Sequence, residues 1–506
     1  MDRRGIVGYY VCDLYKEINL IKKAYEKYKN LSLQVQASIW YTIFNVLNKG
    51  ISLISTPFFT RLMNASEYGK FAIFQSWYSI LIIFSSMNIF LGSYQKGLIS
   101  FKDKKDEFTS SQLGLTTVLT FICFVIYLIF KDTWLNFSDL SHLLMLFMFI
   151  ELLTMPAFEF WSVSNRFEYK FKKYAIVTFF SSILSITGGI LAVWLSSNKV
   201  EARVITDVLS KLIFALPILI LIFYKGKCFF NKRYWKYALL FNVPLIPHYL
   251  ANYALGQSDR IMIGKLIGSS EAAFYSVAYT ISMMMMLIIS AINNSFIPYL
   301  YKELDKKNVD NIKEITKPII FLVFILTVLT IIFAPEIILI FAGKQYLSAI
   351  YVIPPVACSA FFIFIYSLYS NIEYFYEKTA YISLATIISG LLNVFLNYVF
   401  IRKYGYYAAG YTTLICYMFL SLFHYYFYNR ILKTNFHTEI DIYGSKFILF
   451  MSLLLIIVMF LMTITYKSIL LRYSILLLMF IVIIKNKEFM LKSLNILRGT
   501  NKVESN

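Results

Sequence analysis

Six ionisable side chains that lie within or at the ends of apolar segments are the residues of this sequence best placed to do chemistry. An unpaired charge near the centre of a bilayer costs at least ~3 kcal/mol, so such a residue is expected to face a polar cavity or to be paired. Lys49 lies about 12 residues, or ~18 Å along a helix, from either end of its segment. The other five are Glu151, Glu159, Lys211, Asp259 and Arg260.

The three cations predict a site for an anion. Ammonium and guanidinium groups donate charge-assisted hydrogen bonds to phosphate or pyrophosphate oxygens. We therefore predict that Lys49, Lys211 and Arg260 contribute to a cavity that receives an anionic substrate. The predicted polar cavity or ion-coupling residues are Asn45, Glu151, Glu159 and Asp259.

Two structural alternatives remain open for these charges. In the first, Lys49 pairs with Glu151 across helices, and the pair only locks one half of the protein. In the second, Asp259 and Arg260 form an interfacial pair at the outer edge of a cavity, and for Asp259 this alternative is preferred over a ligand role.

The composition of the chain requires a membrane. Apolar residues make up 59% of the 506 residues and charged residues only 15%, and the mean hydropathy is +0.64. Apolar runs of about 20 residues recur along the chain, each long enough to cross a hydrocarbon core of ~30 Å. The sequence thus predicts an all-α polytopic membrane protein with about fourteen transmembrane helices. We place the spans near 37–60, 69–94, 112–130, 140–162, 174–195, 204–224, 237–257, 272–299, 316–334, 348–370, 380–401, 407–428, 446–466 and 469–485.

The distribution of positive charge predicts the orientation. With a cytoplasmic N-terminus, Lys and Arg on the cytoplasmic side outnumber those on the opposite side roughly three to one, so both termini are predicted to be cytoplasmic. The net charge of +20 comes from cations in short loops, which argues against a nucleic-acid partner. Residues 1–36 are basic and are expected either to lie on the membrane as an amphipathic helix or to be a solvated tail.

An internal repeat divides the chain. Residues 61–71 (RLMNASEYGKF) match residues 265–275 (KLIGSSEAAFY) at an offset of 204, and residues 200–209 match residues 406–415 at an offset of 206. Because the offset covers six spans, both copies enter the membrane in the same direction, an arrangement used by secondary transporters. The predicted parts are a basic tail (1–36), an N-lobe (37–224), a C-lobe (225–430), and two further spans with a cytoplasmic tail (431–506).

Four motifs resemble one family. They are 60–73 (TRLMNASEYGKFAI), 258–279 (SDRIMIGKLIGSSEAAFYSVAY), 294–301 (NSFIPYLY) and 403–413 (KYGYYAAGYTT). With these motifs the chain resembles the bacterial Wzx-type polysaccharide repeat-unit flippases, which export O-antigen and capsule units. That family belongs to the multidrug/oligosaccharidyl-lipid/polysaccharide exporter superfamily.

The resemblance implies a flippase of the bacterial cytoplasmic membrane. Its substrate would be an undecaprenyl-pyrophosphate-linked oligosaccharide, moved from the inner to the outer leaflet by alternating access. A polymerase and a chain-length regulator are the expected partners. The resemblance implies no enzyme activity, cofactor or metal, and it leaves the coupling ion, H⁺ or Na⁺, unassigned.

Three other functions are considered. A cation-coupled multidrug exporter of the same superfamily would need an acidic cavity, for which Glu151 and Glu159 are the available residues. A flippase for a peptidoglycan precursor is chemically close to the main prediction. A membrane polysaccharide polymerase would need a large outward loop, and the predicted outward loops are short.

Overall fold

The computed structural model describes residues 32–436 and 441–485, and within these residues all regular structure is helical. The prediction of an amphipathic helix in the basic tail falls on residues 1–31 and lies outside the described residues. The helices are α2 (Leu33–Leu62), α3 (Ala65–Ser86), α4 (Ser93–Ser100), η1 (Lys102–Lys104), α5 (Lys105–Ile129), α6 (Lys131–Ser138), α7 (His142–Phe167), α8 (Phe171–Leu195), α9 (Lys199–Gly226), α10 (Lys232–Asn242), η2 (Val243–Leu245), α11 (Ile246–Leu266), α12 (Ser269–Ser282), η3 (Met283–Met285), α13 (Met286–Asp305), α14 (Val309–Ile332), α15 (Ala334–Phe341), η4 (Lys344–Tyr351), α16 (Ile353–Phe375), α17 (Thr379–Tyr404), α18 (Tyr407–Phe436), α19 (Ser445–Thr465) and α20 (Ile469–Lys485).

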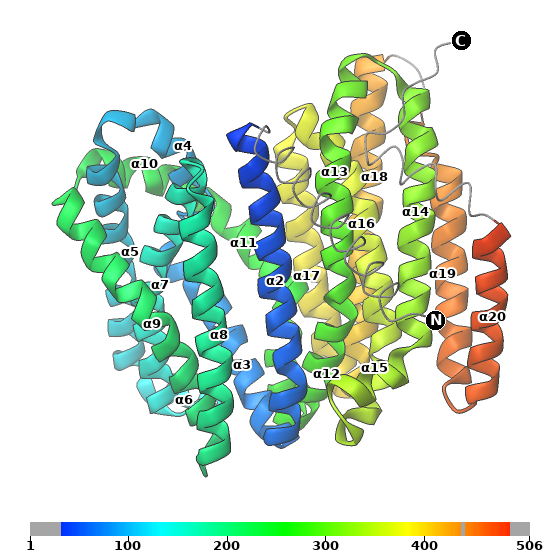
Figure 1. The fold of residues 1–506 in the computed structure, drawn as a ribbon, viewed down its shortest axis with the longest axis horizontal. Coiled ribbons are helices and arrows are strands. Elements are labelled where there is room, and N and C mark those ends of the chain that lie inside the picture. Colours follow the sequence, from blue (N-terminus) through cyan, green and yellow to red (C-terminus); the bar gives the residue numbers. More distant parts are fainter. Residues whose placement is uncertain (1–31, 437–440, 486–506) are drawn as a thin grey trace, which may run out of the picture.

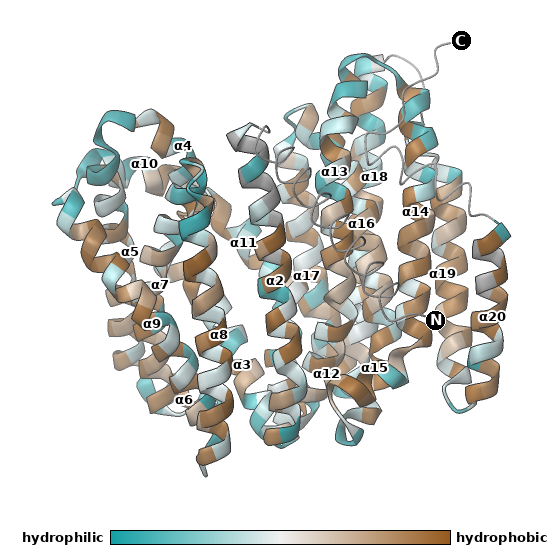
Figure 2. Ribbon diagram, viewed as in Figure 1, coloured by the Kyte–Doolittle hydropathy of each residue, from teal (hydrophilic) through white to brown (hydrophobic). Residues whose placement is uncertain are grey.

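The predicted membrane architecture is confirmed, and each predicted span overlaps a helix. Nine helices of the described part of the chain are long and apolar enough to cross a membrane by length and composition alone. The remaining predicted spans coincide with α2, α3, α11, α18 and α20, which are shorter or richer in polar residues. Figure 2 shows hydrophobic residues along the middle of the bundle and hydrophilic residues towards its ends.

Short helices at the two ends of the bundle were not predicted. Helix α10 joins the two halves of the chain, and it is amphipathic, because Lys232, Arg233 and Lys236 are exposed while Tyr234 and Ala238 are buried. Helix α15 and η4 connect α14 to α16 at the opposite end (Figure 1). We call these the α10 end and the α15 end. The predicted topology assigns the α10 end to the cytoplasm.

The two halves of the chain pack their helices in the same pairs. In the first half α7 packs on α9, α8 on α9, α2 on α8 and α5 on α7. The repeat-related pairs in the second half are α16 on α18, α17 on α18, α11 on α17 and α14 on α16. Figure 1 shows most of the first half on the left and most of the second on the right, with α2 and α11 between them. The exact lobe boundaries, 37–224 and 225–430, stay predictions.

The halves meet where α3 crosses α11 and α12. Gly69 on α3 is buried there, and a Cβ atom at this position would overlap the carbonyl oxygen of Ser269 on α12. The close crossing of α3 and α12 is therefore possible only because residue 69 is a glycine, which has no side chain. This glycine lies in one of the matched repeat segments, close to the α15 end.

Further contacts join the halves at the α15 end. The Thr60 Oγ1 of α2 donates to the Phe341 carbonyl oxygen at 3.1 Å, and Arg61 Nη2 donates to the Ile340 carbonyl oxygen at 2.8 Å. The Gln345 amide donates to the Thr60 carbonyl oxygen. These bonds and the α3–α12 crossing hold the two halves together at the α15 end.

The last two helices are tied to the same region. Arg472 on α20 is 4% exposed and donates to both carboxylate oxygens of Glu336 on α15, at 2.8 and 2.7 Å. Such a bidentate pair fixes orientation as well as distance. Glu336 therefore anchors α20 to α15.

Gly69→Ala should lower the stability of the purified protein by about 1–3 kcal/mol, the usual cost of overpacking. Gly50→Ala on α2 is the matched control, because a Cβ there has no neighbour within 4 Å. Thermal unfolding in detergent compares the two variants with the unsubstituted protein. Equal unfolding temperatures for both variants would show that the α3–α12 crossing tolerates a side chain.

Candidate functional site

A charged network in the first half is centred on Lys211. Its Nζ donates to Glu151 Oε1 at 2.6 Å and to Asp207 Oδ2 at 2.9 Å. Asp207 and Lys211 are four residues apart on α9, so they lie on one face of that helix, while Glu151 reaches them from α7. Glu151 is 1% exposed, and this pairing supplies the counter-charge that a buried carboxylate requires.

Asp207 extends the network to α8 and α3. Its Oδ1 accepts from Ser185 Oγ at 2.5 Å, and its Oδ2 accepts from Gln75 Nε2 at 3.4 Å. Arg203 lies one turn earlier on α9, with Nη1 4.0 Å from Asp207 Oδ1. Its guanidinium stacks over the Phe59 ring at 4.0 Å from the centroid. Two cations thus face two carboxylates, and the network carries no net charge.

Lys49 does not take part in this network. The alternative that it pairs with Glu151 is wrong, because Glu151 is bound by Lys211 instead. Lys49 is exposed on α2 and forms no hydrogen bond or ion pair with the side chains that the structure describes. Its charge is therefore free to meet a substrate, whereas that of Lys211 is engaged.

The remaining first-half candidates are less defined. Glu159 is half-buried on α7, two turns from Glu151, and makes no hydrogen bond to the residues that the structure describes. Asn45 belongs to α2, one turn before Lys49, but its side chain lies outside what the structure describes.

Asp259 anchors a polar cluster in the second half. It is fully buried on α11 and accepts hydrogen bonds from Tyr275 on α12, from Asn397 Nδ2 on α17 at 2.5 Å, and from Thr413 Oγ1 on α18 at 3.1 Å. Its three partners are neutral, so the carboxylate is well solvated by the protein without a counter-charge.

Arg260 points elsewhere, so the predicted interfacial pair with Asp259 is wrong. Consecutive residues of a helix do not face the same side. Arg260 is 7% exposed, donates to Gln257 Oε1 at 2.6 Å and to the Gly256 carbonyl oxygen at 3.1 Å, and lies over the Tyr279 ring. Among the described residues no carboxylate pairs with it.

The structure brings cations of both halves towards one tyrosine. Tyr68 on α3 lies within electrostatic range of Arg203 from the first half and Arg260 from the second. Arg203 and Asp207 were missed from the sequence, although they share the helical face of Lys211 at intervals of four residues. The predicted span began at residue 204, which placed Arg203 outside the membrane.

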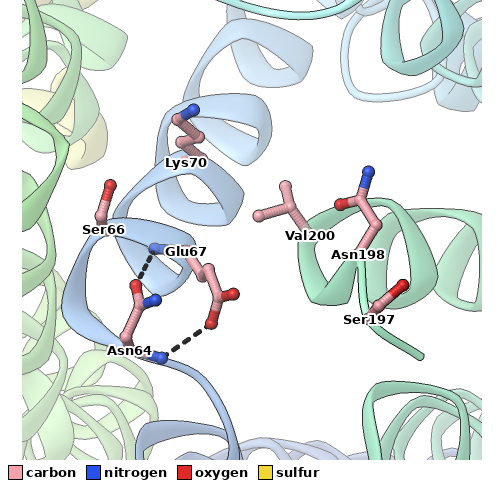
Figure 3. A pocket seen from close by; sticks show the side chains of 7 residues that line it. All are labelled: Asn64, Ser66, Glu67, Lys70, Ser197, Asn198 and Val200. Atoms are coloured by element: carbon pink, nitrogen blue, oxygen red, sulfur yellow. Dashed lines mark hydrogen bonds between the residues drawn. The ribbon is translucent and has the colours of Figure 1, made fainter. Parts of the chain in front are cut away.

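A separate polar pocket of about 340 Å³ lies at the α15 end. Figure 3 shows its lining, in which Asn64 and Glu67 bond each other's backbone as a capping box for α3. Lys70 is its one cation, and the predicted site residues are not among its lining residues within the described chain. We interpret this pocket as a surface hollow between the N-terminal ends of α3 and α9.

Comparison with known proteins gives the family. A family model described as "polysaccharide biosynthesis protein" matches residues 35–304, more than half of the chain. The chain belongs to this family. A second model, MatE, matches residues 244–399. The predicted resemblance to polysaccharide flippases is thereby confirmed at the level of the family and superfamily.

Curated relatives of this polysaccharide biosynthesis protein come from Haemophilus influenzae. The "Lsg locus putative protein 1" is 24% identical over 375 residues, which cover 71% of this chain and 88% of the relative. An "uncharacterized membrane protein" is 23% identical over 375 residues, covering 72% and 89%.

Solved structures show that the fold is that of known transporters. The lipid II flippase MurJ in an inward closed conformation aligns over 89% of this chain and all of its own, with a TM-score of 0.66 and 18% identity. An inward-facing multidrug resistance MATE transporter aligns over 77% of this chain and 96% of its own, with a TM-score of 0.54 and 15% identity.

Lys211→Met should destabilise this family member by about 3 kcal/mol, because it leaves a buried carboxylate uncompensated. Adding Glu151→Met should recover much of the loss, since Asp207 keeps Arg203 and Ser185. Lys49→Met is the control and should leave the unfolding temperature unchanged. A double variant as unstable as Lys211→Met would mean that the Lys211–Glu151 contact contributes little.

Proposed function

We propose that the protein is a flippase for undecaprenyl-pyrophosphate-linked oligosaccharide repeat units in the bacterial cytoplasmic membrane. It would move them from the inner to the outer leaflet for O-antigen, capsule or exopolysaccharide synthesis. The observation that carries the proposal is charge: Lys49 and Arg260 have no carboxylate partner within the described residues, whereas the Lys211 network is neutral.

Two unpaired cations in halves that move relative to each other suit a pyrophosphate. Lys49 on α2 belongs to the first half and Arg260 on α11 to the second. A charge-assisted hydrogen bond contributes about 1.5–3 kcal/mol, so a pyrophosphate bridging both residues would be bound better than a neutral lipid. The polyprenyl chain would stay in the bilayer, beside the exposed apolar side chains of the helices.

The contacts at the α15 end support an alternating-access cycle. The predicted topology places both termini in the cytoplasm, and the α15 end then faces outward. With Thr60, Arg61 and Gly69 joining the halves there, this arrangement would then be closed to the outside. Releasing the substrate outward would require these contacts to separate.

The charge distribution argues against a cationic drug as the main substrate. A multidrug exporter would need accessible carboxylates, but Glu151 and Asp207 are neutralised by Lys211 and Arg203, and Asp259 is fully buried. Of the three predicted acidic cavity residues, Glu159 is the one that is half-buried and has no partner in the described residues. A peptidoglycan-precursor lipid carries the same pyrophosphate, so the geometry does not separate it from the proposed substrate.

Lys49→Ala and Arg260→Ala should each reduce export about tenfold to a hundredfold, the equivalent of one lost charge-assisted bond to phosphate. Surface polysaccharide and lipid-linked units that accumulate in the inner leaflet are measured in a strain deleted for the gene. Lys49→Arg and Arg260→Lys are the matched controls, which keep the charge and should retain most of the export.

Protein amounts in the membrane must be equal across these variants. Unchanged export in a Lys49→Ala, Arg260→Ala double variant would show that neither residue binds the substrate. Rescue of a strain depleted of its lipid II flippase, without any effect on surface polysaccharide, would assign the peptidoglycan precursor instead.

A further inference from the structure

Glu373 and His424 form a pair inside the second half that the proposed transport site does not use. Glu373 lies on α16 and His424 on α18, and His424 Nδ1 is 2.8 Å from Glu373 Oε1. Both side chains are 0% exposed. The Tyr366 ring stacks on the imidazole, with ring centroids 5.4 Å apart and planes 20° apart.

Each member of the pair keeps one polar atom without a partner. Glu373 Oε2 and His424 Nε2 are buried and form no hydrogen bond with the described residues. A buried polar atom without a partner costs free energy and calls for an explanation. The single bond between the two side chains is thus the main polar interaction that either of them has.

The other ionisable groups nearby do not compensate the pair. Tyr366 and Tyr374 on α16, and Tyr417, which stacks on Tyr366, are the surrounding titratable side chains. Within the described residues no ion pair joins Glu373 or His424 to a charged side chain of a neighbouring element. The charged side chains on those elements are Asp259, Arg260 and Lys265 on α11, Glu271 on α12, Lys302, Glu303 and Asp305 on α13, Asp310, Lys313, Glu314 and Lys317 on α14, Lys344 on η4, Lys378 before α17, Arg402 and Lys403 on α17, Arg430 and Lys433 on α18, and Lys446 on α19.

The charge balance of the pair follows from these contacts. With one proton shared between carboxylate and imidazole, the pair is neutral, either as an ion pair or as two neutral groups. Without that proton it carries a charge of −1 in a place closed to water, which is unfavourable in a low-dielectric interior. The packing of α16 against α18 shown here therefore requires the protonated pair.

We propose that Glu373 and His424 together are a proton-binding site that takes up one proton and couples it to movement of α16 against α18. The proposal rests on the proposed transport function and specifies H⁺ as a coupling ion. Glu373 lies two residues before the end of α16, at the α10 end. Proton exchange would thus occur on the side that the topology assigns to the cytoplasm.

The site has no equivalent in the first half. At the offset of 206 that relates α9 to α18, His424 corresponds to Ile218. Glu373 corresponds to Asn165 at the end of α7, because the backbone carbonyl of each accepts from the N–H five residues later, Lys378 and Lys170. The first half instead contains the neutral Lys211 network. Proton binding would therefore act on one half of the transporter only.

Infrared difference spectra between pH 8 and pH 5 test the site directly. The full chain is purified in lipid nanodiscs without substrate. We expect a carboxyl band and an imidazole band that are both lost or displaced in Glu373→Gln, and a carboxyl band that is displaced in His424→Gln. Because each variant removes a different member of the pair, one variant still tests the site if the other folds poorly.

Two controls identify the residues. His142 bonds the neutral Tyr127 hydroxyl at 2.6 Å, so His142→Gln should remove its own imidazole band and leave the carboxyl band unchanged. Asp259→Asn removes the other fully buried carboxylate of the second half and should leave both bands of the pair in place. Spectra of Glu373→Gln and His424→Gln identical to that of the unsubstituted protein would overturn the proposal.

The measurement contains no lipid-linked substrate, so a wrong substrate assignment leaves its outcome unchanged. If export depends on Lys49 and Arg260 while the spectra do not depend on Glu373, the flippase proposal stands and the proton site is wrong. If the spectra depend on Glu373 while export depends on neither cation, the proton site stands and the substrate assignment is wrong.

Discussion

The cost of holding charge away from water is the constraint on which this structure depends. The protein meets it in two ways. In the first half, Lys211 and Arg203 balance Glu151 and Asp207, so four charged groups sum to zero. In the second half, neutral hydroxyl and amide donors surround the single carboxylate of Asp259.

The two halves share a packing plan but not their polar contents. The residues of α18 that correspond to Arg203, Asp207 and Lys211 at an offset of 206 are Ala409, Thr413 and Tyr417. Thr413 still serves a buried carboxylate, but as a neutral donor to Asp259 of another helix. Duplication thus preserved which helices touch, while the charges on them diverged. The four buried charges of the first-half network balance one another, whereas the buried Asp259 and Arg260 of the second half have no counter-charge among the described residues.

The fold could largely be predicted from sequence, because the length and hydropathy of each segment fix a membrane span locally. The Arg61–Phe71 and Lys265–Tyr275 match also indicated the duplication. The ion-pair partner of each buried charge was harder to predict, since it depends on how each helix is rotated about its axis relative to its neighbours. Lys49 and Glu151 both looked buried and opposite in charge, yet the carboxylate faces α9 and not α2. The charges on α9 could have been found from their spacing of four residues, had the span been started one residue earlier.

The surroundings of Asp259 and Glu373 could not be predicted from the hydropathy of single segments. Their surroundings come from helices far apart in sequence, so a plain hydropathy profile shows only two acidic residues near helix ends. Whether such a residue lies at a surface or inside the protein is decided by tertiary packing. Here the packing makes Asp259 fully buried, although it is adjacent to an arginine that points away.

The bidentate contact between Arg472 and Glu336 gives the last two helices a mechanical role. The α15–η4 segment binds α20 through Glu336 and binds α2 through residues 340–345. The α19–α20 hairpin is therefore linked, through α15 and η4, to the contacts that join the two halves. Helix α20 exposes Leu470, Leu477 and other apolar side chains to the surrounding lipid. A change in bilayer thickness that tilts the α19–α20 hairpin would therefore also strain the contacts between the halves at the α15 end. The proposed separation of the halves would then depend on the lipid environment through the Arg472–Glu336 contact.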